Sequence, residues 1–393
     1  MAGSSPLVGV INAGSSSLKF AFFEKDSPII AGQVEGIGAR PAVRAARVDG
    51  RSIAAFELGR IPPRTAGDVL PVLIPWAKEQ LDGRRLGALG HRVVHGGTRR
   101  IGPERVTSEL LTELEALIPL APLHQPHNLA PIRTALKLNP TLPQVACFDT
   151  AFHRSVPEVA QSFGLTAELH DEGVRRYGFH GLSYEYIAAL LPEQAPEIAN
   201  GRVIVAHLGN GASLCALKAR ISIASTMGFS VLDGLPMGTR CGEIDPGAIL
   251  YLLQHKGLAP TEVSHLLYQQ SGMLGLSGVS SDFRDLLCSQ DPRADFAIRV
   301  FCYQTVRHIG SLAAALGGID GIVFTAGVGE NADQIRAAVC KGCSWLGLAL
   351  DEAANQRHGP LITKAGSRVA AYVMKTDENL IIARHTRNVL GMI

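Results

Sequence analysis

The sequence predicts an α/β protein built from two related halves. Residues 7–23 and 202–217 carry the same design, a strand, a turn rich in Gly, Ser or Asn, and a second strand, and they lie about half the chain apart. Behind each of these segments, strand patterns alternate with helix patterns, which is typical of sheets covered by helices. The length of 393 residues allows two or three domains at roughly 150 residues per domain.

The first half continues with two further strands. Residues 90–95 and 144–149 are apolar runs that end in polar residues, and a helical pattern over 108–118 separates them. In the second half, a helix over 295–316 leads into a strand at 321–325 and a glycine turn. Each half therefore contains enough material for its own sheet.

The domain boundaries follow from these halves. We expect a first domain over 1–150 and a second over 151–378. Residues 379–393 have a helical pattern of apolar side chains, and we expect this helix to pack back on the first domain and close it.

Composition limits the function classes. Apolar residues make up 46% and charged residues 18%, as in compact globular proteins. The 37 basic and 35 acidic residues give a net charge of +2, so we expect no nucleic-acid or membrane partner, and an anionic ligand needs a local site. The seven cysteines are odd in number and scattered, and we find neither a signal-peptide pattern nor an apolar run of membrane-spanning length. These features predict a cytoplasmic protein.

Two glycine-rich turns are candidates for phosphate binding. No Gly-Lys dipeptide occurs, so the Walker A motif is absent from the sequence. The turns within 12–19 and 207–211 instead offer backbone N–H groups of small residues, which can form anion-binding concavities. They can also be two ordinary hairpins, but their equivalence in the two halves favours phosphate.

The segment Gly327-Val-Gly-Glu-Asn-Ala332 matches the dinucleotide fingerprint G-x-G-x-x-A. That fingerprint normally opens its βαβ unit, whereas this copy follows two other glycine turns. We interpret it as a strand-to-helix turn near the adenine or ribose of a nucleotide.

The 13 histidines raise the alternative of a zinc hydrolase. His91 and His95 fall in an expected strand, and His124 and His127 fall in an expected proline-rich loop, so neither pair has an established ligand geometry. We disfavour zinc on this ground.

Two arginines and one aspartate are candidates for anion chemistry. Arg92 and Arg240 stand beside glycines, where a guanidinium can approach a carboxylate or phosphate with two hydrogen bonds, although a solvated surface arginine is the commoner case. Asp149 follows an apolar strand, where a carboxylate is costly unless it is paired, functional or caps a helix. The carboxylates of 376–379 either cap the last helix or face Mg²⁺.

Eight motifs together resemble those of the acetokinase family, which belongs to the superfamily of sugar kinases, actin and heat-shock ATPases. In chain order, the motifs begin at Asn12, His91, Ala121, Cys147, Tyr177, His207, Met237 and Phe324. The resemblance implies two duplicated domains of the actin-like ATPase (ribonuclease H-like) type, with the active site in the cleft between them.

The resemblance also implies an activity. It is reversible, Mg²⁺-dependent phosphoryl transfer from ATP to acetate by direct in-line transfer, giving acetyl phosphate and ADP, in a homodimer. A nucleotide-gated binding protein of the actin or chaperone type shares the fold but does not need the arginine and histidine motifs.

Site residues follow by motif position. The implied catalytic residues are Arg92, Asp149, His180 and Arg240. The implied substrate-binding residues are Arg92, Val94, Leu123, Phe179 and Val231. The implied nucleotide-binding residues are Lys19, His207, Leu208, Gly209, Asn210, Gly211, Asp282, Phe283, Arg284, Gly327, Val328, Gly329, Glu330 and Asn331. The implied magnesium-site residues are Asn12 and Glu378.

Two questions stay open. Val231 stands where the family commonly has proline, so acetate and propionate are both candidate acceptors. Asp149 acts either as a base or as a group that orients an arginine or a magnesium-bound water, and the second is favoured because a carboxylate substrate is already ionised near pH 7.

Overall fold

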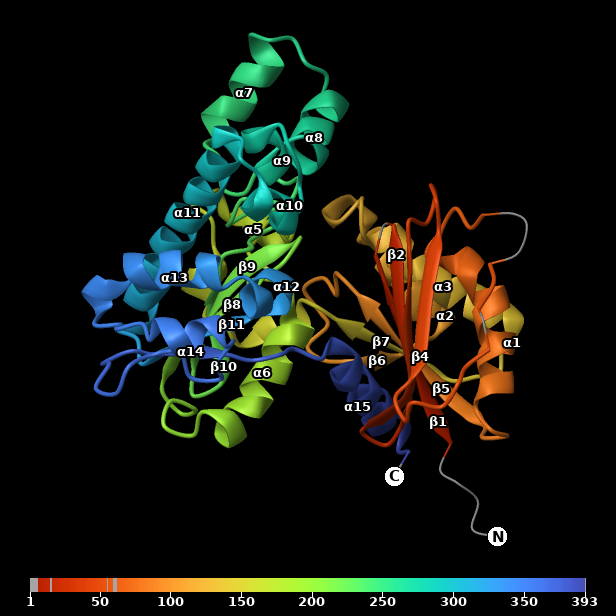
Figure 1. Cartoon of the computed structure of the whole chain (residues 1–393). Helices are drawn as coiled ribbons and strands as arrows, with labels where there is room; N and C mark the ends of the chain where they lie inside the picture. The colour runs from red at the N-terminus through yellow and green to blue at the C-terminus, as the bar shows by residue number, and fades with distance from the viewer. Residues whose placement is uncertain (1–5, 15, 55, 59–61, 393) are drawn as a thin grey trace. The chain divides into compact units, whose positions relative to one another are not determined.

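The computed structural model describes residues 6–14, 16–54, 56–58 and 62–392. The chain divides into two compact units (Figure 1). Unit 1 comprises Met1–Phe152 and Asp377–Ile393, and unit 2 comprises His153–Thr376. This division lies two residues from the boundaries expected from the sequence, and it assigns Asp377 and Glu378 to unit 1 rather than to the second domain.

Unit 1 contains a seven-stranded sheet in the order β4-β3-β2-β1-β5-β7-β6. The strands are β1 (Leu7–Ala13), β2 (Ser17–Glu24), β3 (Ser27–Glu35), β4 (Ala42–Arg47), β5 (Leu86–Val93), β6 (Glu104–Arg105) and β7 (Gln144–Phe148). The first four strands form an antiparallel meander, whereas β1, β5 and β7 run parallel. The carboxyl ends of these three parallel strands therefore meet at one edge of the sheet.

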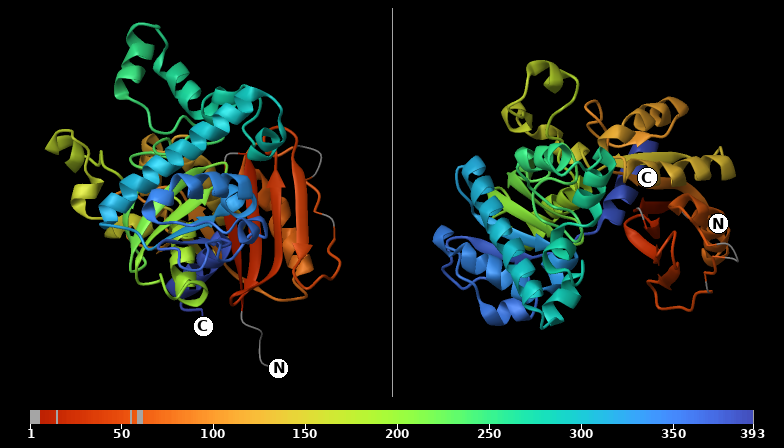
Figure 2. Two further views of the ribbon diagram at one scale, coloured as in Figure 1. Left: turned by 60° about the vertical axis from the view of Figure 1, so that its left-hand side comes forward. Right: turned by 90° about the horizontal axis from the view of Figure 1, so that it is seen from above.

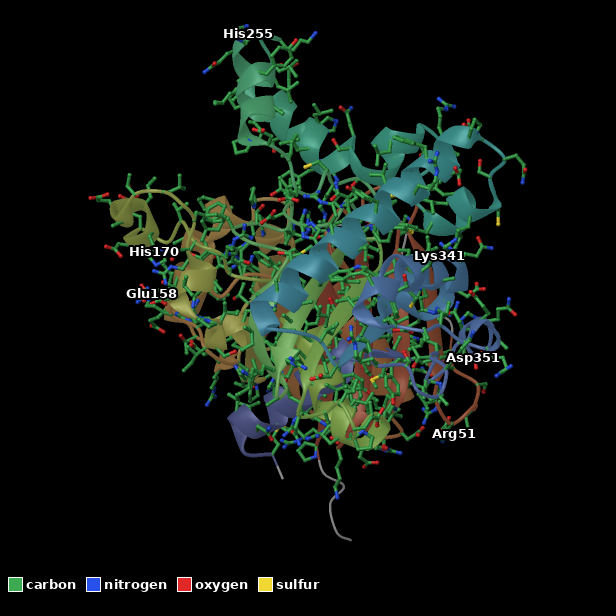
Figure 3. All side chains as sticks on the ribbon, turned by 90° about the vertical axis from the view of Figure 1, so that its left-hand side faces the viewer. Arg51, Glu158, His170, His255, Lys341 and Asp351 are labelled. Atoms are coloured by element: carbon green, nitrogen blue, oxygen red, sulfur yellow. The ribbon has the colours of Figure 1, made fainter. Side chains whose placement is uncertain are left out.

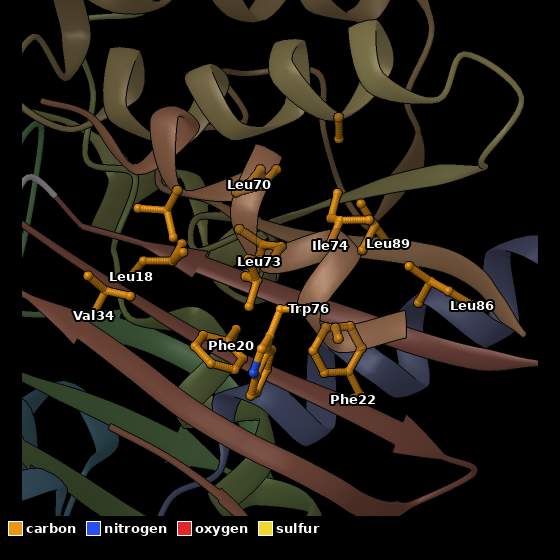
Figure 4. Packing of buried hydrophobic residues seen from close by; sticks show 14 of the residues in the cluster. Leu18, Phe20, Phe22, Val34, Leu70, Leu73, Ile74, Trp76, Leu86 and Leu89 are labelled. Atoms are coloured by element: carbon orange, nitrogen blue, oxygen red, sulfur yellow. The ribbon is translucent and has the colours of Figure 1, made fainter. Parts of the chain in front are cut away.

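Helices cover the sheet of unit 1. They are α1 (Leu70–Gln80), α2 (Ser108–Ala116), α3 (Gln125–Leu138) and α15 (Glu378–Leu390). A core cluster lies between α1 and strands β1–β3, where Trp76 packs edge-on against Phe20 at 6.0 Å between ring centroids (Figure 4). Phe56 contacts both rings, with centroids 5.1 Å from Trp76 and 6.1 Å from Phe20. Aromatic pairs of this kind add to the free energy of burying their area.

The C-terminal helix α15 packs on β1, β5 and β7, as its apolar pattern predicted. Gly90 of β5 permits this close approach, because a Cβ atom there would lie 2.2 Å from Oγ1 of Thr386 and 2.7 Å from Cγ2 of Ile382. Asp377 caps the helix by accepting a hydrogen bond from the N–H of Leu380 at 3.0 Å.

Unit 2 contains a five-stranded sheet in the order β10-β9-β8-β11-β12. The strands are β8 (Arg202–Leu208), β9 (Ala212–Lys218), β10 (Ile221–Ser225), β11 (Gly321–Thr325) and β12 (Ala370–Val373). Three antiparallel strands are again followed by two parallel ones, the same arrangement as β3-β2-β1-β5-β7 of unit 1. The duplication inferred from the two turn motifs is thus visible in the topology.

Most of the remaining helices belong to unit 2. They are α4 (Glu158–Gln161), α5 (Ala167–Asp171), α6 (Gly181–Gln194), α7 (Pro246–Gln254), α8 (Pro260–Gln269), α9 (Gly272–Ser277), α10 (Phe283–Cys288), α11 (Pro292–Leu316), α12 (Ala326–Asn331), α13 (Asp333–Gly342) and α14 (Glu352–Gln356). The long helix α11 packs along β8, β9 and β10 (Figure 2). Helices α7 and α8 form a pair, and His255 marks the end of α7 (Figure 3).

Some sequence-based boundaries were wrong. The segment around His124 and His127 is not a loop, because α3 begins at Gln125 with a proline in its first turn, where a missing N–H costs no hydrogen bond. Strand β5 begins at Leu86 and ends at Val93, so His95 lies beyond it. Among the described helices, none is long and apolar enough to cross a membrane.

Candidate functional site

Unit 1 gathers four predicted site residues where its parallel strands end. Asn12 lies near the end of β1, Arg92 near the end of β5, and Asp149 directly follows β7. Glu378 is the first residue of α15, which packs on the same strands. Strand order thus brings together residues that are far apart in the sequence.

Arg92 and Asp149 form a bidentate ion pair. The Nη2 atom of Arg92 lies 2.5 Å from Oδ2 of Asp149, and its Nε atom lies 3.0 Å from Oδ1. The Asp149 side chain is 1% exposed and that of Arg92 is 21% exposed. Asn12 donates from Nδ2 to Oε2 of Glu378 at 3.0 Å, and its Oδ1 lies 3.4 Å from Nη1 of Arg92.

The geometry of the pair leaves part of the guanidinium for a ligand. The contact to Asp149 is side-on, through Nε and one hydrogen of Nη2. The end of a guanidinium formed by Nη1 and Nη2 can receive a carboxylate or phosphate with two parallel hydrogen bonds. In Arg92, the Nη1 atom of this end also lies 3.4 Å from Oδ1 of Asn12. Burial by itself lowers the pKa of Arg92, but the carboxylates of Asp149 and Glu378 outweigh it and raise that pKa, so the guanidinium stays charged.

A buried asparagine holds the strand ends in place. Asn128 of α3 accepts from the N–H of Val94 at 2.9 Å and donates to the carbonyl of Ala13 at 2.7 Å. It therefore ties the end of β1 to the end of β5. Asn128 is not among the residues predicted from the sequence, because a polar residue shortly after a proline carries no signal that it is buried and bridges two strands.

The four residues predicted to line an acyl pocket belong to different units. Val94 is buried and Leu123 half-buried in unit 1, whereas Phe179 and Val231 are buried in unit 2. The carbonyl of Val231 accepts a hydrogen bond from Nη1 of Arg240 at 2.9 Å, so these two predicted site residues are neighbours.

His180 lies at the start of α6 in a left-handed backbone conformation, with φ of 57°. Its Nδ1 lies 2.8 Å from Oγ of Ser213, which is also 2.5 Å from the hydroxyl of Tyr184. The imidazole stacks on that of His207 with ring centroids 4.2 Å apart. Ser213 and Tyr184, to which the resemblance assigned no role, therefore fix the orientation of the His180 ring.

The turn after β8 brings Arg240 and His180 together. A Cβ atom built on Gly211 would lie 3.3 Å from Nη2 of Arg240 and 3.3 Å from Nε2 of His180. Gly238, in the Arg240 loop, donates its N–H to the carbonyl of Asn210 at 3.1 Å. The turn and the loop are thus joined, with a cation and an imidazole beside the same glycine.

A cavity of about 670 Å³ opens in unit 2 beside this turn. Its walls come from the turn after β8, the start of α10 and the first turns of α12, and they include Gly209, Asn210, Ser281, Asp282, Phe283, Arg284, Leu287, Gly327, Val328, Asn331 and Ala332. Eight of the fourteen predicted nucleotide-binding residues line it. The cavity falls within the range of small-molecule sites.

Individual residues of this cavity differ in what they can offer a ligand. Asp282 caps α10 and pairs with Arg284 at 2.5 Å, and the Arg284 side chain is 89% exposed. Phe283 lines the cavity, and its buried ring packs edge-on against Phe301 at 4.7 Å between centroids. The G-x-G-x-x-A segment forms α12 directly after β11, as a strand-to-helix turn.

The other six predicted nucleotide residues do not line the cavity. Lys19 is exposed on β2 of unit 1. His207, Leu208 and Gly329 are buried, and Gly211 lies beside Arg240 and His180. Glu330 accepts hydrogen bonds from the N–H groups of Ala326 and Thr376, which is a structural role.

Asn12 and Glu378 carry oxygen atoms of the kind that bind a magnesium ion. Mg²⁺ prefers oxygen donors and in kinases is usually held by one or two protein groups together with substrate phosphates. The two side chains are neighbours, with Nδ2 of Asn12 3.0 Å from Oε2 of Glu378, while Oδ1 of Asn12 lies 3.4 Å from Nη1 of Arg92. In the described part of the chain, no group of three or more His, Cys, Asp or Glu residues could hold a metal ion by itself.

The chain was compared with known proteins. Residues 7–384 match the acetokinase family. The chain is 51% identical over 385 residues to an acetate kinase of Rhodopseudomonas palustris, with 96% of each chain covered. It is also 51% identical over 388 residues to an acetate kinase of Nitrobacter hamburgensis, with 97% of this chain and 95% of that protein covered.

Solved structures agree with these relatives. The crystal structure of Porphyromonas gingivalis acetate kinase is 34% identical with a TM-score of 0.86, covering 98% of this chain and 100% of that one. A propionate kinase from Francisella tularensis is 34% identical with a TM-score of 0.89 and the same coverage. The expected family and fold class are therefore confirmed: this chain belongs to the acetokinase family and is a phosphotransferase that uses a carboxyl group as acceptor.

Proposed function

We propose that the chain transfers the γ-phosphoryl group of ATP to acetate, reversibly and with Mg²⁺, giving acetyl phosphate and ADP. The observation that carries this proposal is the side-on pair of Arg92 with buried Asp149, which presents a fixed cationic fork next to Asn12 and Glu378. Acetate needs such a cationic partner, because its carboxylate is its one charged group and the only group that can form strong hydrogen bonds.

Asp149 acts here as a positioning group for Arg92. The acetate carboxylate is ionised near neutral pH and needs no base. One of its oxygens forms the new bond to the γ-phosphorus while the bond from that phosphorus to the bridging oxygen breaks, and ADP leaves with the electron pair. No proton has to move in this step.

Arg240 and His180 stabilise the transferred group. An in-line transfer passes through a loose, metaphosphate-like state whose charge is spread over three oxygens. A guanidinium and an imidazole whose nitrogens flank Gly211 can donate to these oxygens, and both are held beforehand by Val231 and Ser213. The cavity of unit 2 supplies walls for the nucleotide.

Asn12 and Glu378 would hold Mg²⁺ together with the substrate phosphates, because the described residues contain no group of three or more His, Cys, Asp or Glu that could enclose the ion. When bound, the ion neutralises charge on the phosphates. Asn12 at the end of β1 and Glu378 at the start of α15 are rigid supports for these two ligands.

The direct test traps the product. Purified protein is incubated with Mg-ATP and acetate, propionate or butyrate, and acyl phosphate is captured by hydroxylamine as hydroxamate. We expect the highest kcat/KM for acetate. A higher kcat/KM for propionate, which Val231 in place of the family's proline favours, would make propionate the acceptor. If folded protein that binds ATP forms no hydroxamate with any of the three acids, the proposed function is refuted.

We propose further that the protein is a homodimer that uses α7. None of the nine residues of this helix is buried, although five of them are large and apolar, and Leu250 and Tyr251 are 51% and 50% exposed. A helix that is apolar on most of its circumference normally lies in an interface. A second copy is the partner we propose. We also propose a cytoplasmic location, which the odd number and scattered positions of the seven cysteines support.

The oligomer test is sedimentation of the double variant Leu250→Glu and Tyr251→Glu. We expect a monomer, because two carboxylates would have to be buried in the dimer. Val159→Glu, at a valine that is 85% exposed on α4, is the matched control and should sediment like the wild type. A double variant that remains dimeric would exclude α7 from the interface.

A further inference from the structure

His153 is a buried histidine that the mechanism above does not use. It is the first residue of unit 2 and lies four positions after Asp149. Its residue exposure is 2%. Sγ of Cys215 lies 4.0 Å from Nδ1 of its ring. The ring nitrogens also make two shorter contacts, with Nδ1 2.9 Å from Oγ of Ser222 and Nε2 2.9 Å from the carbonyl oxygen of Phe179.

These two contacts determine the tautomer. A carbonyl oxygen only accepts hydrogen bonds, so Nε2 of His153 carries the proton and donates to Phe179. Nδ1 then accepts from the hydroxyl of Ser222. Burial lowers the pKa of His153 to about 4, so the ring stays neutral and keeps this arrangement near pH 7.

The carbonyl that His153 holds belongs to the residue directly before His180. Gly178 and His180 both have left-handed backbones, with φ of 76° and 57°, so this turn has an unusual conformation on both sides of Phe179. A left-handed backbone is unfavourable for a histidine and persists only where the surroundings hold it. The hydrogen bond from His153 is one such restraint.

The His153 ring also fills the space beside this turn. A Cβ atom on Gly178 would lie 2.5 Å from Cγ of His153 and 2.6 Å from its Cδ2, so the glycine and the ring are matched in shape. The ring meets Tyr184 edge-on at 5.7 Å, and the Tyr184 hydroxyl contacts the serine that holds Nδ1 of His180. His153 thus supports His180 through its backbone and through its side-chain partner.

We propose that His153 is a positioning residue for phosphoryl transfer, which holds the 178–180 turn so that Nε2 of His180 stays beside Gly211 and Arg240. This inference rests on the proposed role of His180 in stabilising the transferred group. His153 itself touches neither substrate. Its loss should lower kcat and leave the binding of ATP and acetate nearly unchanged, because a small displacement of a catalytic group costs up to about 10²-fold in rate.

A pair of amide substitutions separates positioning from packing. In His153→Gln, the side-chain amide reaches the place of Nε2 and can donate to Phe179, whereas in His153→Asn it reaches only the place of Nδ1. Both variants lose the ring and bury an amide. We expect kcat to fall about 10- to 100-fold in His153→Asn and no more than about 3-fold in His153→Gln, with both KM values within about 3-fold of the wild type.

Two controls complete the experiment. His170→Asn, at a histidine on the periphery of unit 2 (Figure 3), should behave as the wild type. In a His180→Ala background, adding His153→Asn should change the residual kcat by less than about 2-fold, because a residue that acts through His180 has nothing left to position.

The outcomes are distinguishable. Equal losses of kcat in the Asn and Gln variants, or a full additional loss in the His180→Ala background, would overturn the positioning role and leave the proposed function intact. Wild-type activity of His180→Ala would instead overturn the proposed site. Should His153→Asn fail to fold, ¹⁵N NMR of the wild-type protein still decides, since a His153 tautomer protonated at Nδ1 would contradict the inference.

Discussion

Replacing Arg92 with lysine tests the core of the proposed site, because it preserves the charge and removes the fork. Arg92 contacts Asp149 through two nitrogens and keeps a two-pronged edge for the substrate. A lysine ammonium is a single point donor that cannot make both bidentate contacts. Arg92→Lys therefore separates charge from geometry.

The magnitude follows from the hydrogen bonds that are lost. A hydrogen bond to a charged group contributes about 1.5–3 kcal/mol, so losing one of the two donors to the substrate carboxylate predicts a fall in kcat/KM for acetate of roughly 10- to 150-fold. Arg92→Ala loses both and should fall roughly 10²- to 10⁴-fold. The Kd for ATP should stay unchanged in both variants.

Stability distinguishes the two substitutions. Arg92→Ala leaves Asp149, 1% exposed, without its partner, which costs about 3 kcal/mol and lowers Tm by roughly 6–12 °C for a domain of this size. Arg92→Lys keeps a cation beside the carboxylate and should lower Tm by much less.

The assay is hydroxamate formation at varied acetate, together with ATP titration and thermal unfolding. Arg84→Lys is the matched control, since Arg84 makes one surface contact to Glu24 at 3.1 Å. If Arg92→Lys retains the activity of Arg84→Lys, the fork is not what binds the carboxylate and the reasoning fails.

Three further predictions concern the metal, the closing helix and pH. Glu378→Gln should raise the Mg²⁺ concentration for half-maximal rate on the order of 10-fold or more without weakening metal-free ATP binding, and an unchanged magnesium titration would exclude it as a ligand. Gly90→Ala should cost roughly 1–3 kcal/mol in urea unfolding because its Cβ meets α15, whereas Gly102→Ala, with nothing within 4 Å, should be neutral. Burial lowers the pKa of His91 from its usual 6.5 to about 4. As the pH falls, the unfolded chain therefore binds a proton at this histidine before the folded chain does. The contribution of neutral His91 to the free energy of unfolding is fully present above about pH 6.5 and is lost as the pH falls towards 4. At pH 4.5 this loss is roughly 2–3 kcal/mol for His91, and His91→Gln should flatten that part of the stability profile; an equal pH dependence in the variant would disprove it.

The predictions from sequence succeeded where the signal was local. Strand β11 has the predicted bounds, and the hairpins β1–β2 and β8–β9 appear where alternating apolar runs flank small polar turns. Helix α15 packs on β1, β5 and β7 of unit 1 because its apolar stripe is stabilised by burial against the sheet. In such segments, side-chain periodicity and turn chemistry agree, so neighbours along the chain carry the information.

The sequence misled where tertiary contacts override a local rule. The prolines around His127 suggested a loop, yet α3 accommodates one in its first turn and a second inside the helix. Strands β3 and β4 and helix α1 were not predicted, because their apolar pattern becomes clear only against the core that contains Trp76.

In the candidate site, too, the sequence predicted individual residues, whereas their contacts depend on the tertiary structure. The motif comparison named Arg92 and Asp149 individually, but their pairing depends on β5 and β7 being parallel neighbours, although the two residues are 57 positions apart. It assigned no role to Ser213, Asn128 or His153, since serine, asparagine and histidine at these positions acquire their roles only from what surrounds them.

The sequence by itself therefore determined the family, the duplicated α/β design and the chemical types of the site residues, because these depend on local patterns and motif order. Only the tertiary structure decided which strands are neighbours, which side-chain atoms meet, and that burial keeps His91 and His153 neutral while Arg92 stays charged. The physical reason is that hydrogen bonds, ion pairs and desolvation act between groups brought close in space, and strand order sets that proximity across long stretches of chain.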